Sequence, residues 1–238
     1  MYLADRRNYF VLDGKSSLDF GVWTNGYETF KGATRDTTGV IVPGRHGTLV
    51  NDNGRFENVD MIYRDCGIVR EDALEHYRTL RAFLAVHSDA FYRLEDTYHP
   101  DEYRMAQFVG PLEPDIDDRY ETALFDIAFI CKPQHFLKSG EKWVENPSSL
   151  FNPTIFEAAP VIRIYGTGTL QVGSKTITIA SHTLDHIDID CDLGDAYCGS
   201  TNANRFVTMD DVPKLKPGTT NFVGTVTKYE IQPRWWEA

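Results

Sequence analysis

The sequence predicts a mainly β chain with a single α-helix, and three observations support this fold class. One stretch, 72–86, repeats its apolar residues with helical spacing. Short runs that alternate apolar and polar residues fill most of the remainder, separated by Gly, Pro and Asn. A polar, proline-rich connector over 138–160 marks a domain boundary. We therefore expect a β-sandwich-like N-terminal domain over 1–145, with the helix packed on it, and a C-terminal β-sandwich over 150–238.

Strands and turns are predicted before the helix. The runs 9–12 and 18–23 read as strands. Pro43-Gly44-Arg45-His46-Gly47 is a loop with glycines on both sides of a basic pair. Asn53-Gly54 is the strongest hairpin-turn signal in the chain.

The predicted helix at 72–86 has one apolar face, formed by Ala73, Tyr77, Leu80 and Leu84. Glu75, Arg78 and Arg81 lie on the polar side. Asp72 followed by Glu75 has the spacing of an acidic capping box. A lone amphipathic helix in a β-rich chain usually covers one face of a sheet. We expect this helix to brace the N-terminal domain.

After the helix, 90–95 and 104–109 read as a hairpin and 110–118 as a loop. A long strand follows at 122–131, with apolar residues on both faces, so both faces are expected to be covered.

The pattern from Pro160 onward is entirely β. Short strands are predicted at 161–165, 169–172, 176–179 and 184–190, and a last long strand at 221–231. This spacing is typical of a small sandwich or jelly roll.

Composition excludes several classes of protein. The net charge of −11 argues against a dedicated nucleic-acid binder, because phosphate contacts need clustered Lys and Arg. No apolar run reaches the length of a membrane span, and no secretory signal is recognisable, so we expect a soluble protein made in a cytoplasm. The four scattered cysteines are expected to be buried thiols rather than disulfides or metal ligands.

No catalytic, cofactor or metal site is predicted. Gly166-x-Gly168 is followed by a strand, so it reads as a hairpin turn and not a dinucleotide loop. The calcium-loop pattern that begins at Asp188 lacks the required glycine and the final glutamate. His182 and His186 would share a wet strand face, but no third metal ligand is identifiable. A G-x-S-x-G elbow is absent, and no pair of carboxylates is marked for glycoside hydrolysis.

The Trp235-Trp236 pair near the C-terminus suggests an interface. Adjacent residues of a strand point to opposite faces, so one core cannot easily bury both rings. We expect one ring to pack inside and the other against a neighbouring domain or subunit.

Several stretches together resemble the distal tail protein family of siphophages and prophages, often called Dit. They occur in the expected order along nearly the whole chain: 14–21 (GKSSLDFG), 42–47 (VPGRHG), 131–134 (CKPQ), 152–154 (NPT), 159–160 (AP), 187–190 (IDID), 196–197 (AY) and 231–236 (IQPRWW).

The resemblance implies a structural virion protein and no enzyme activity. Such proteins form a hexameric ring at the distal end of the tail. The ring joins the tail tube to the tail-tip hub and the receptor-binding proteins, and DNA passes through it. The resemblance also implies a galectin-like or carbohydrate-module-like C-terminal sandwich, assembly in the host cytoplasm, and no cofactor.

The interface residues expected on this reading come from the unusual loop and the doubled tryptophan. They are Pro43, Gly44, Arg45, His46, Arg234, Trp235 and Trp236. Two alternatives remain open at this point. One is a carbohydrate-binding adhesin that holds host surface glycans through the C-terminal domain. The other is a tail-associated glycan hydrolase, which no residue pattern supports.

Overall fold

The computed structural model of this chain describes residues 8–69, 72–117 and 122–238. It divides into two compact units. Unit 1 is Met1–His135 together with Ala238, and unit 2 is Phe136–Glu237. Each unit has its own hydrophobic core. The mainly β architecture with one helix agrees with the predicted fold class.

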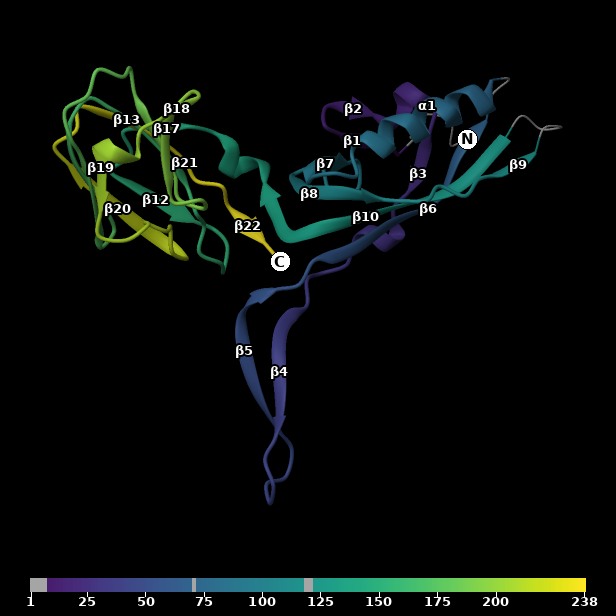
Figure 1. Cartoon of the computed structure of the whole chain (residues 1–238), viewed down its shortest axis with the longest axis horizontal. Coiled ribbons are helices and arrows are strands. Elements are labelled where there is room, and N and C mark those ends of the chain that lie inside the picture. The colour runs from purple at the N-terminus through teal and green to yellow at the C-terminus, as the bar shows by residue number, and fades with distance from the viewer. Residues whose placement is uncertain (1–7, 70–71, 118–121) are drawn as a thin grey trace. The chain divides into compact units, whose positions relative to one another are not determined.

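Unit 1 is built on one antiparallel sheet with the strand order β2-β1-β7-β8-β10-β6-β3, and β9 also pairs with β10 (Figure 1). The strands are β1 (Phe10–Leu12), β2 (Lys15–Ser16), β3 (Trp23–Asn25), β6 (Val59–Val69), β7 (Tyr92–Asp96), β8 (Glu102–Val109), β9 (Asp115–Asp117) and β10 (Thr122–Leu137). The predicted hairpin after the helix is confirmed as β7 and β8. The segment predicted as a loop over 110–118 contains β9, which adds to the edge of β10.

Helix α1 (Ala73–Val86) confirms the predicted helix and lies over the sheet of unit 1 (Figure 1). Its buried residues are those of the predicted apolar face, Ala73, Tyr77, Leu80 and Leu84. The Tyr77 ring packs edge-on against Phe125 of β10, with 5.5 Å between centroids. Burying each large apolar side chain stabilises the fold by about 1.5–3 kcal/mol. The helix is therefore held mainly by this face.

The predicted capping box at Asp72 is wrong. The Asp72 side chain makes no capping hydrogen bond and instead lies 3.1 Å from Nε2 of His76, one turn along the helix. A complete capping box forms elsewhere, at the start of the 3₁₀ helix η2 (Ser17–Phe20). There Ser16 Oγ accepts from Leu18 N, and Asp19 accepts from Ser16 N. The strand predicted over 18–23 is thus mostly this 3₁₀ turn, and only β3 follows.

Strand β10 has one buried and one open face. Ala123, Phe125, Ile127, Phe129 and Cys131 are buried, as their alternation predicts. On the opposite face Leu124 is 44% exposed and Asp126 is also exposed. The expectation that both faces are covered is wrong for these two positions in the single chain, because the helix covers one face only.

A second, separate sheet in unit 1 has two strands, β4 (Arg35–Ile41) and β5 (Thr48–Phe56) (Figure 1). These strands pair with each other and with no other strand in the described residues. The chain turns between them at 42–47. The predicted turn at Asn53-Gly54 is wrong, because Gly54, at φ +77°, lies in a bulge inside β5. The short 3₁₀ helix η3 (Tyr27–Thr29) precedes β4.

Unit 2 is a β-sandwich of two antiparallel sheets, with strand orders β11-β21-β13-β16-β17-β18 and β12-β20-β14-β15-β19. The strands are β11 (Val144–Glu145), β12 (Ser149–Asn152), β13 (Val161–Tyr165), β14 (Gly168–Val172), β15 (Lys175–Ile179), β16 (Ile187–Asp190), β17 (Asp195–Cys198), β18 (Thr201–Asn202), β19 (Val207–Met209), β20 (Gly218–Gly224) and β21 (Lys228–Gln232). The last strand, β22 (Trp236–Glu237), belongs to neither sheet and pairs with β10. Two 3₁₀ helices complete it, η4 (Lys138–Glu141) and η5 (Asn204–Phe206). Strands β11 and β12 lie within the segment that the sequence suggests as a connector.

Two strand predictions in unit 2 need correction. The long strand expected over 221–231 is split into β20 and β21 by a turn at 225–227. The strand expected over 184–190 begins only at Ile187, so His182 and His186 do not share a strand face. Asp188, expected on a wet face, is 6% exposed, because the Arg163 guanidinium covers it with two hydrogen bonds of 2.7 and 2.9 Å.

Two further features bear on function. Within the described ranges, no helix combines the length and apolar character needed to cross a bilayer. The same residues contain no group of three His, Cys, Asp or Glu side chains arranged to hold a metal ion.

Candidate assembly interface

The two-stranded hairpin of β4 and β5, here called the arm, carries the most exposed apolar strand residues of unit 1. Ile41 is 83% exposed and Val50 65%, while Val40 and Leu49 are nearly half exposed. Val40 pairs with Leu49, and Ile41 pairs with Thr48. Because successive residues of a strand point to opposite faces, apolar side chains lie on both faces of the arm. Contiguous exposed apolar surface is a common property of interaction sites, which makes the arm a candidate interface.

Charged and polar side chains connect β4 and β5 at the end of the arm that lies away from the 42–47 turn. Arg35 forms a bidentate pair with Asp52, at 2.9 and 2.6 Å, and its guanidinium lies 4.8 Å from the centroid of the Phe56 ring. Arg55 Nε lies 2.6 Å from the Asp36 carboxylate, which also accepts from the Asn53 amide at 2.8 Å. The Asn53 amide and the Arg55 guanidinium lower the pKa of Asp36, and Arg35 lowers the pKa of Asp52. These contacts join β4 to β5 across the bulge.

The predicted interface residues Pro43, Gly44, Arg45 and His46 form the exposed tip of the arm. Gly44 and Gly47 have φ of +80° and +78°, the left-handed conformation that glycine adopts without strain. The Arg45 amide donates to the Val42 carbonyl at 3.1 Å and closes the turn. No ion pair within the described ranges involves the Arg45 or His46 side chain. The Arg45 guanidinium and the His46 imidazole are thus presented to solvent.

The predicted interface residues Arg234, Trp235 and Trp236 lie in unit 2 and make contacts inside it. Arg234 has φ +59°, and its guanidinium lies 2.9 Å from Asp190. Trp235 is 6% exposed and belongs to the unit 2 core, where Gly140 leaves room for its backbone. The structure thus places one ring of the pair inside, and the other is half-buried.

Trp236 has partners within unit 2. Its ring stacks on Phe156, with centroids 4.4 Å apart and planes 18° from parallel, and its indole N–H donates to the Glu157 carbonyl at 2.9 Å. An interface role for the Arg234–Trp236 group stays a prediction.

The loop motif predicts an interface at the tip of the arm, but the exposure of the apolar residues along its strands was not predicted. The available signal was the run Val40-Ile41-Val42, whose apolar residues do not alternate with polar ones. Such a run normally predicts a strand that is buried on both faces. That both faces are exposed follows only from the absence of a neighbouring strand in the described chain.

Comparison with solved structures shows where this fold occurs. The chain matches the crystal structure of SPP1 Dit (gp 19.1), described as a paradigm of the hub adsorption apparatus in phages that infect Gram-positive bacteria. The TM-score is 0.71 with 12% identity, over 95% of this chain and 98% of that one.

Two structures of the phage P2 baseplate in its activated conformation, one with Ca and one with Sr, also match. Both have a TM-score of 0.55 and 11% identity, over 95% and 94% of this chain and 97% of theirs. No family model matches the sequence, and no curated protein does. The resemblance predicted from the motifs is confirmed at the level of the fold, since this chain folds as SPP1 Dit does along nearly its whole length.

Proposed function

We propose that this chain is a structural component of a phage tail, at its distal end or baseplate. The observation that carries the proposal is the agreement in fold over 95% of this chain and 98% of SPP1 Dit. A match to one β-sandwich alone would carry little weight, because that architecture hosts many unrelated functions. Here the helix-bearing unit and the sandwich occur together in one chain of matching length.

The finer proposal is a homohexameric ring. It joins the tail tube protein to the tail-tip hub and receptor-binding proteins, and it lets DNA pass. Each copy contacts the next through a heterologous interface, and the rotation between copies closes at six. A net charge of −11 suits a passage for DNA, since like charges keep the phosphate backbone from adhering. The role is structural rather than enzymatic, and its location is the virion.

The arm is the part of unit 1 that we propose contacts the next copy. An isolated two-stranded hairpin is at best marginally stable in water. Ile41 and Val50 lose contact with water only if another surface covers them, which contributes roughly 25 cal/mol per Å² buried. In a closed ring every arm has a second copy of this chain beside it, so a second copy is the partner that covers these residues.

The test is the mass of the assembly, measured by light scattering coupled to size exclusion, with negative-stain imaging. Six copies of a 27.1 kDa chain give a ring of about 160 kDa. Ile41→Thr keeps the β-branched shape but removes apolar surface from the arm, so we expect it to weaken assembly.

Ile155→Thr is the matched control, because Ile155 is 82% exposed and Ile41 is 83% exposed. It lies in unit 2 and should leave the mass unchanged. A chain that stays at the monomer mass, alone and with the tail tube protein, would contradict the ring. Equal effects of the two substitutions would contradict the arm as its contact.

A further inference from the structure

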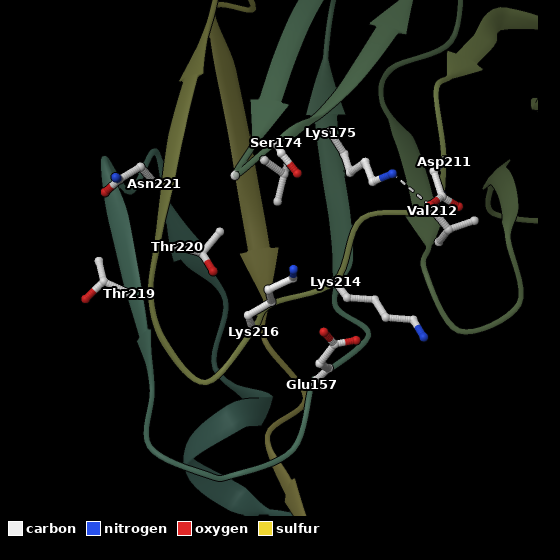
Figure 2. A pocket seen from close by; sticks show the side chains of 12 residues that line it. Glu157, Ser174, Lys175, Asp211, Val212, Lys214, Lys216, Thr219, Thr220 and Asn221 are labelled. Atoms are coloured by element: carbon white, nitrogen blue, oxygen red, sulfur yellow. Dashed lines mark hydrogen bonds and ion pairs between the residues drawn. The ribbon is translucent and has the colours of Figure 1, made fainter. Parts of the chain in front are cut away.

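Unit 2 contains a hollow that the assembly role does not use. Its volume is about 610 Å³, within the range of small-molecule sites. It lies where the turn Gly173–Ser174, between β14 and β15, meets the loop 211–217 and the first half of β20 (Figure 2). Three lysines line it, Lys175, Lys214 and Lys216, together with two carboxylates, Glu157 and Asp211.

The positive charge of the hollow is partly uncompensated. Lys175 Nζ lies 2.9 Å from the Asp211 carboxylate, so these two charges compensate each other. Lys214 and Lys216 form no ion pair with any residue in the described ranges, although both border the same hollow (Figure 2). Glu157 is the remaining carboxylate. In a chain of net charge −11, an excess of ammonium groups in one hollow favours an anion.

The backbone between these two lysines is anchored. Leu215 is fully buried, and it exchanges backbone hydrogen bonds of 3.0 and 2.8 Å with Ala158. The carbonyl of Leu215 also accepts from the buried amide of Asn152 at 3.0 Å. Residues two apart in an extended segment point to the same side. Burial of Leu215 therefore turns Lys214 and Lys216 outward, where both border the hollow.

Neutral polar groups complete the lining. Ser174, Thr219, Thr220 and Asn221 border the hollow, and within the described part of the chain their side chains make no hydrogen bond. Thr220 is only 7% exposed, so its hydroxyl has little access to solvent except from the hollow. Hydroxyl and amide groups both donate and accept hydrogen bonds, which matches the hydroxyls of a sugar.

We propose that this hollow binds an anionic saccharide, a sugar that carries phosphate or carboxylate groups. The ammonium groups of Lys214 and Lys216 pair with the anion, and the hydroxyl and amide groups bind sugar hydroxyls. No aromatic ring borders the hollow, so it offers no stacking platform for a nucleic-acid base. Its apolar side chains are Val172 and Val212, which leaves a protein partner without a large anchor. The inference does not depend on the proposed ring.

The experiment is a titration of the ¹⁵N-labelled full chain, followed by NMR. The probes are glucose 6-phosphate, trigalacturonate, inorganic phosphate, neutral maltotriose and a glutamate-rich peptide. We expect glucose 6-phosphate or trigalacturonate to shift the amides of 173–176 and 211–221, and to bind at least tenfold more tightly than maltotriose. The phosphorylated and carboxylated sugars together show which anion is preferred.

Variants locate the site. Lys214→Gln and Lys216→Gln should each weaken binding about tenfold, as expected for the loss of one charged hydrogen bond. Lys142→Gln is the matched control, since Lys142 is exposed in unit 2 and lies outside the hollow, and it should have no effect. The proposal is overturned by equal losses in all three variants, or by maltotriose, inorganic phosphate or the peptide binding as tightly as the charged sugars.

Discussion

Asp96 lies at the centre of a largely buried hydrogen-bond network in unit 1. Its carboxylate accepts from the Tyr63 hydroxyl at 2.7 Å, from His99 Nδ1 at 2.9 Å and from the His99 amide at 2.8 Å. Burial by itself raises the pKa of Asp96, but the hydrogen bonds from His99 and Tyr63 outweigh it and lower the pKa below its usual value. The network therefore favours the ionised carboxylate.

This pKa shift predicts acid sensitivity. A carboxyl whose pKa is lower in the folded chain contributes stability above its unfolded pKa of about 3.9 and loses it as the pH falls through the folded value. We expect the stability of unit 1 to fall below about pH 4. Asp96→Asn should cost about 1–3 kcal/mol at neutral pH and flatten this dependence. Urea unfolding measured from pH 3 to 7 checks it, and an unchanged slope in the variant would argue against Asp96 as the source.

The four cysteines differ in their accessibility. Cys66, Cys131 and Cys191 are buried, and Cys198 is half-buried. Burial raises the pKa of Cys66, and it raises those of Cys131 and Cys191 to about 12 each. The thiolate is the reactive form of cysteine. The expectation of buried thiols is thus met at three of the four positions.

Thiol labelling at pH 8 should therefore show one fast-reacting group in the folded chain and four after unfolding. A disulfide reagent with an optical readout gives both counts. Cys198→Ser should remove the fast phase without changing the slow one. A fast phase that persists in this variant would show that one of the buried thiols is accessible.

At the scale of single elements, helix α1 is attached to its sheet by one face. Leu80 is fully buried in that face, whereas Leu74, of the same residue type in the same helix, is 42% exposed. Leu80→Ala should cost about 2–5 kcal/mol, because it removes buried methyl groups and leaves a cavity. Leu74→Ala should cost much less, about 0.5 kcal/mol. Chemical denaturation of the two variants gives the comparison, and similar losses would mean that packing on the sheet does not hold the helix.

The polar face of α1 is open in the single chain. Glu75, Arg78 and Arg81 are exposed, so any role for them as contacts requires another copy or another protein. The same reasoning applies to Leu124 on the outer face of β10. The exposed arm differs from both because its apolar residues lie on two faces.

At the scale of the whole molecule, the two hydrophobic cores predict two unfolding events. The clusters share no residue, and one belongs to each unit. We expect calorimetry to resolve two transitions. Leu80→Ala should lower one of them, and Ile162→Ala, at a fully buried position of unit 2, should lower the other. A single transition lowered by either substitution would instead indicate one cooperative unit.

Local sequence patterns predicted the elements whose buried apolar residues recur at a regular spacing. The helix at 73–86 and the buried face of β10 could be predicted from the sequence, because the apolar residues of each recur at the period of that type of secondary structure. Turn chemistry was less reliable. Asn53-Gly54 has the residues of a hairpin turn, yet it lies in a bulge of β5, because Arg35 pairs with Phe56 and Thr37 pairs with Asp52, and these pairings join residues distant in sequence.

The sequence by itself determined the mainly β class, the single helix and the resemblance in fold to a phage tail protein. Only the tertiary structure decided which apolar residues stay exposed, as on the arm, and that Trp236 stacks on Phe156. It also decided that Lys214 and Lys216 meet the turn at Ser174 in one hollow. The physical reason is that periodicity records which face of an element is apolar, whereas contacts between distant segments decide what covers that face.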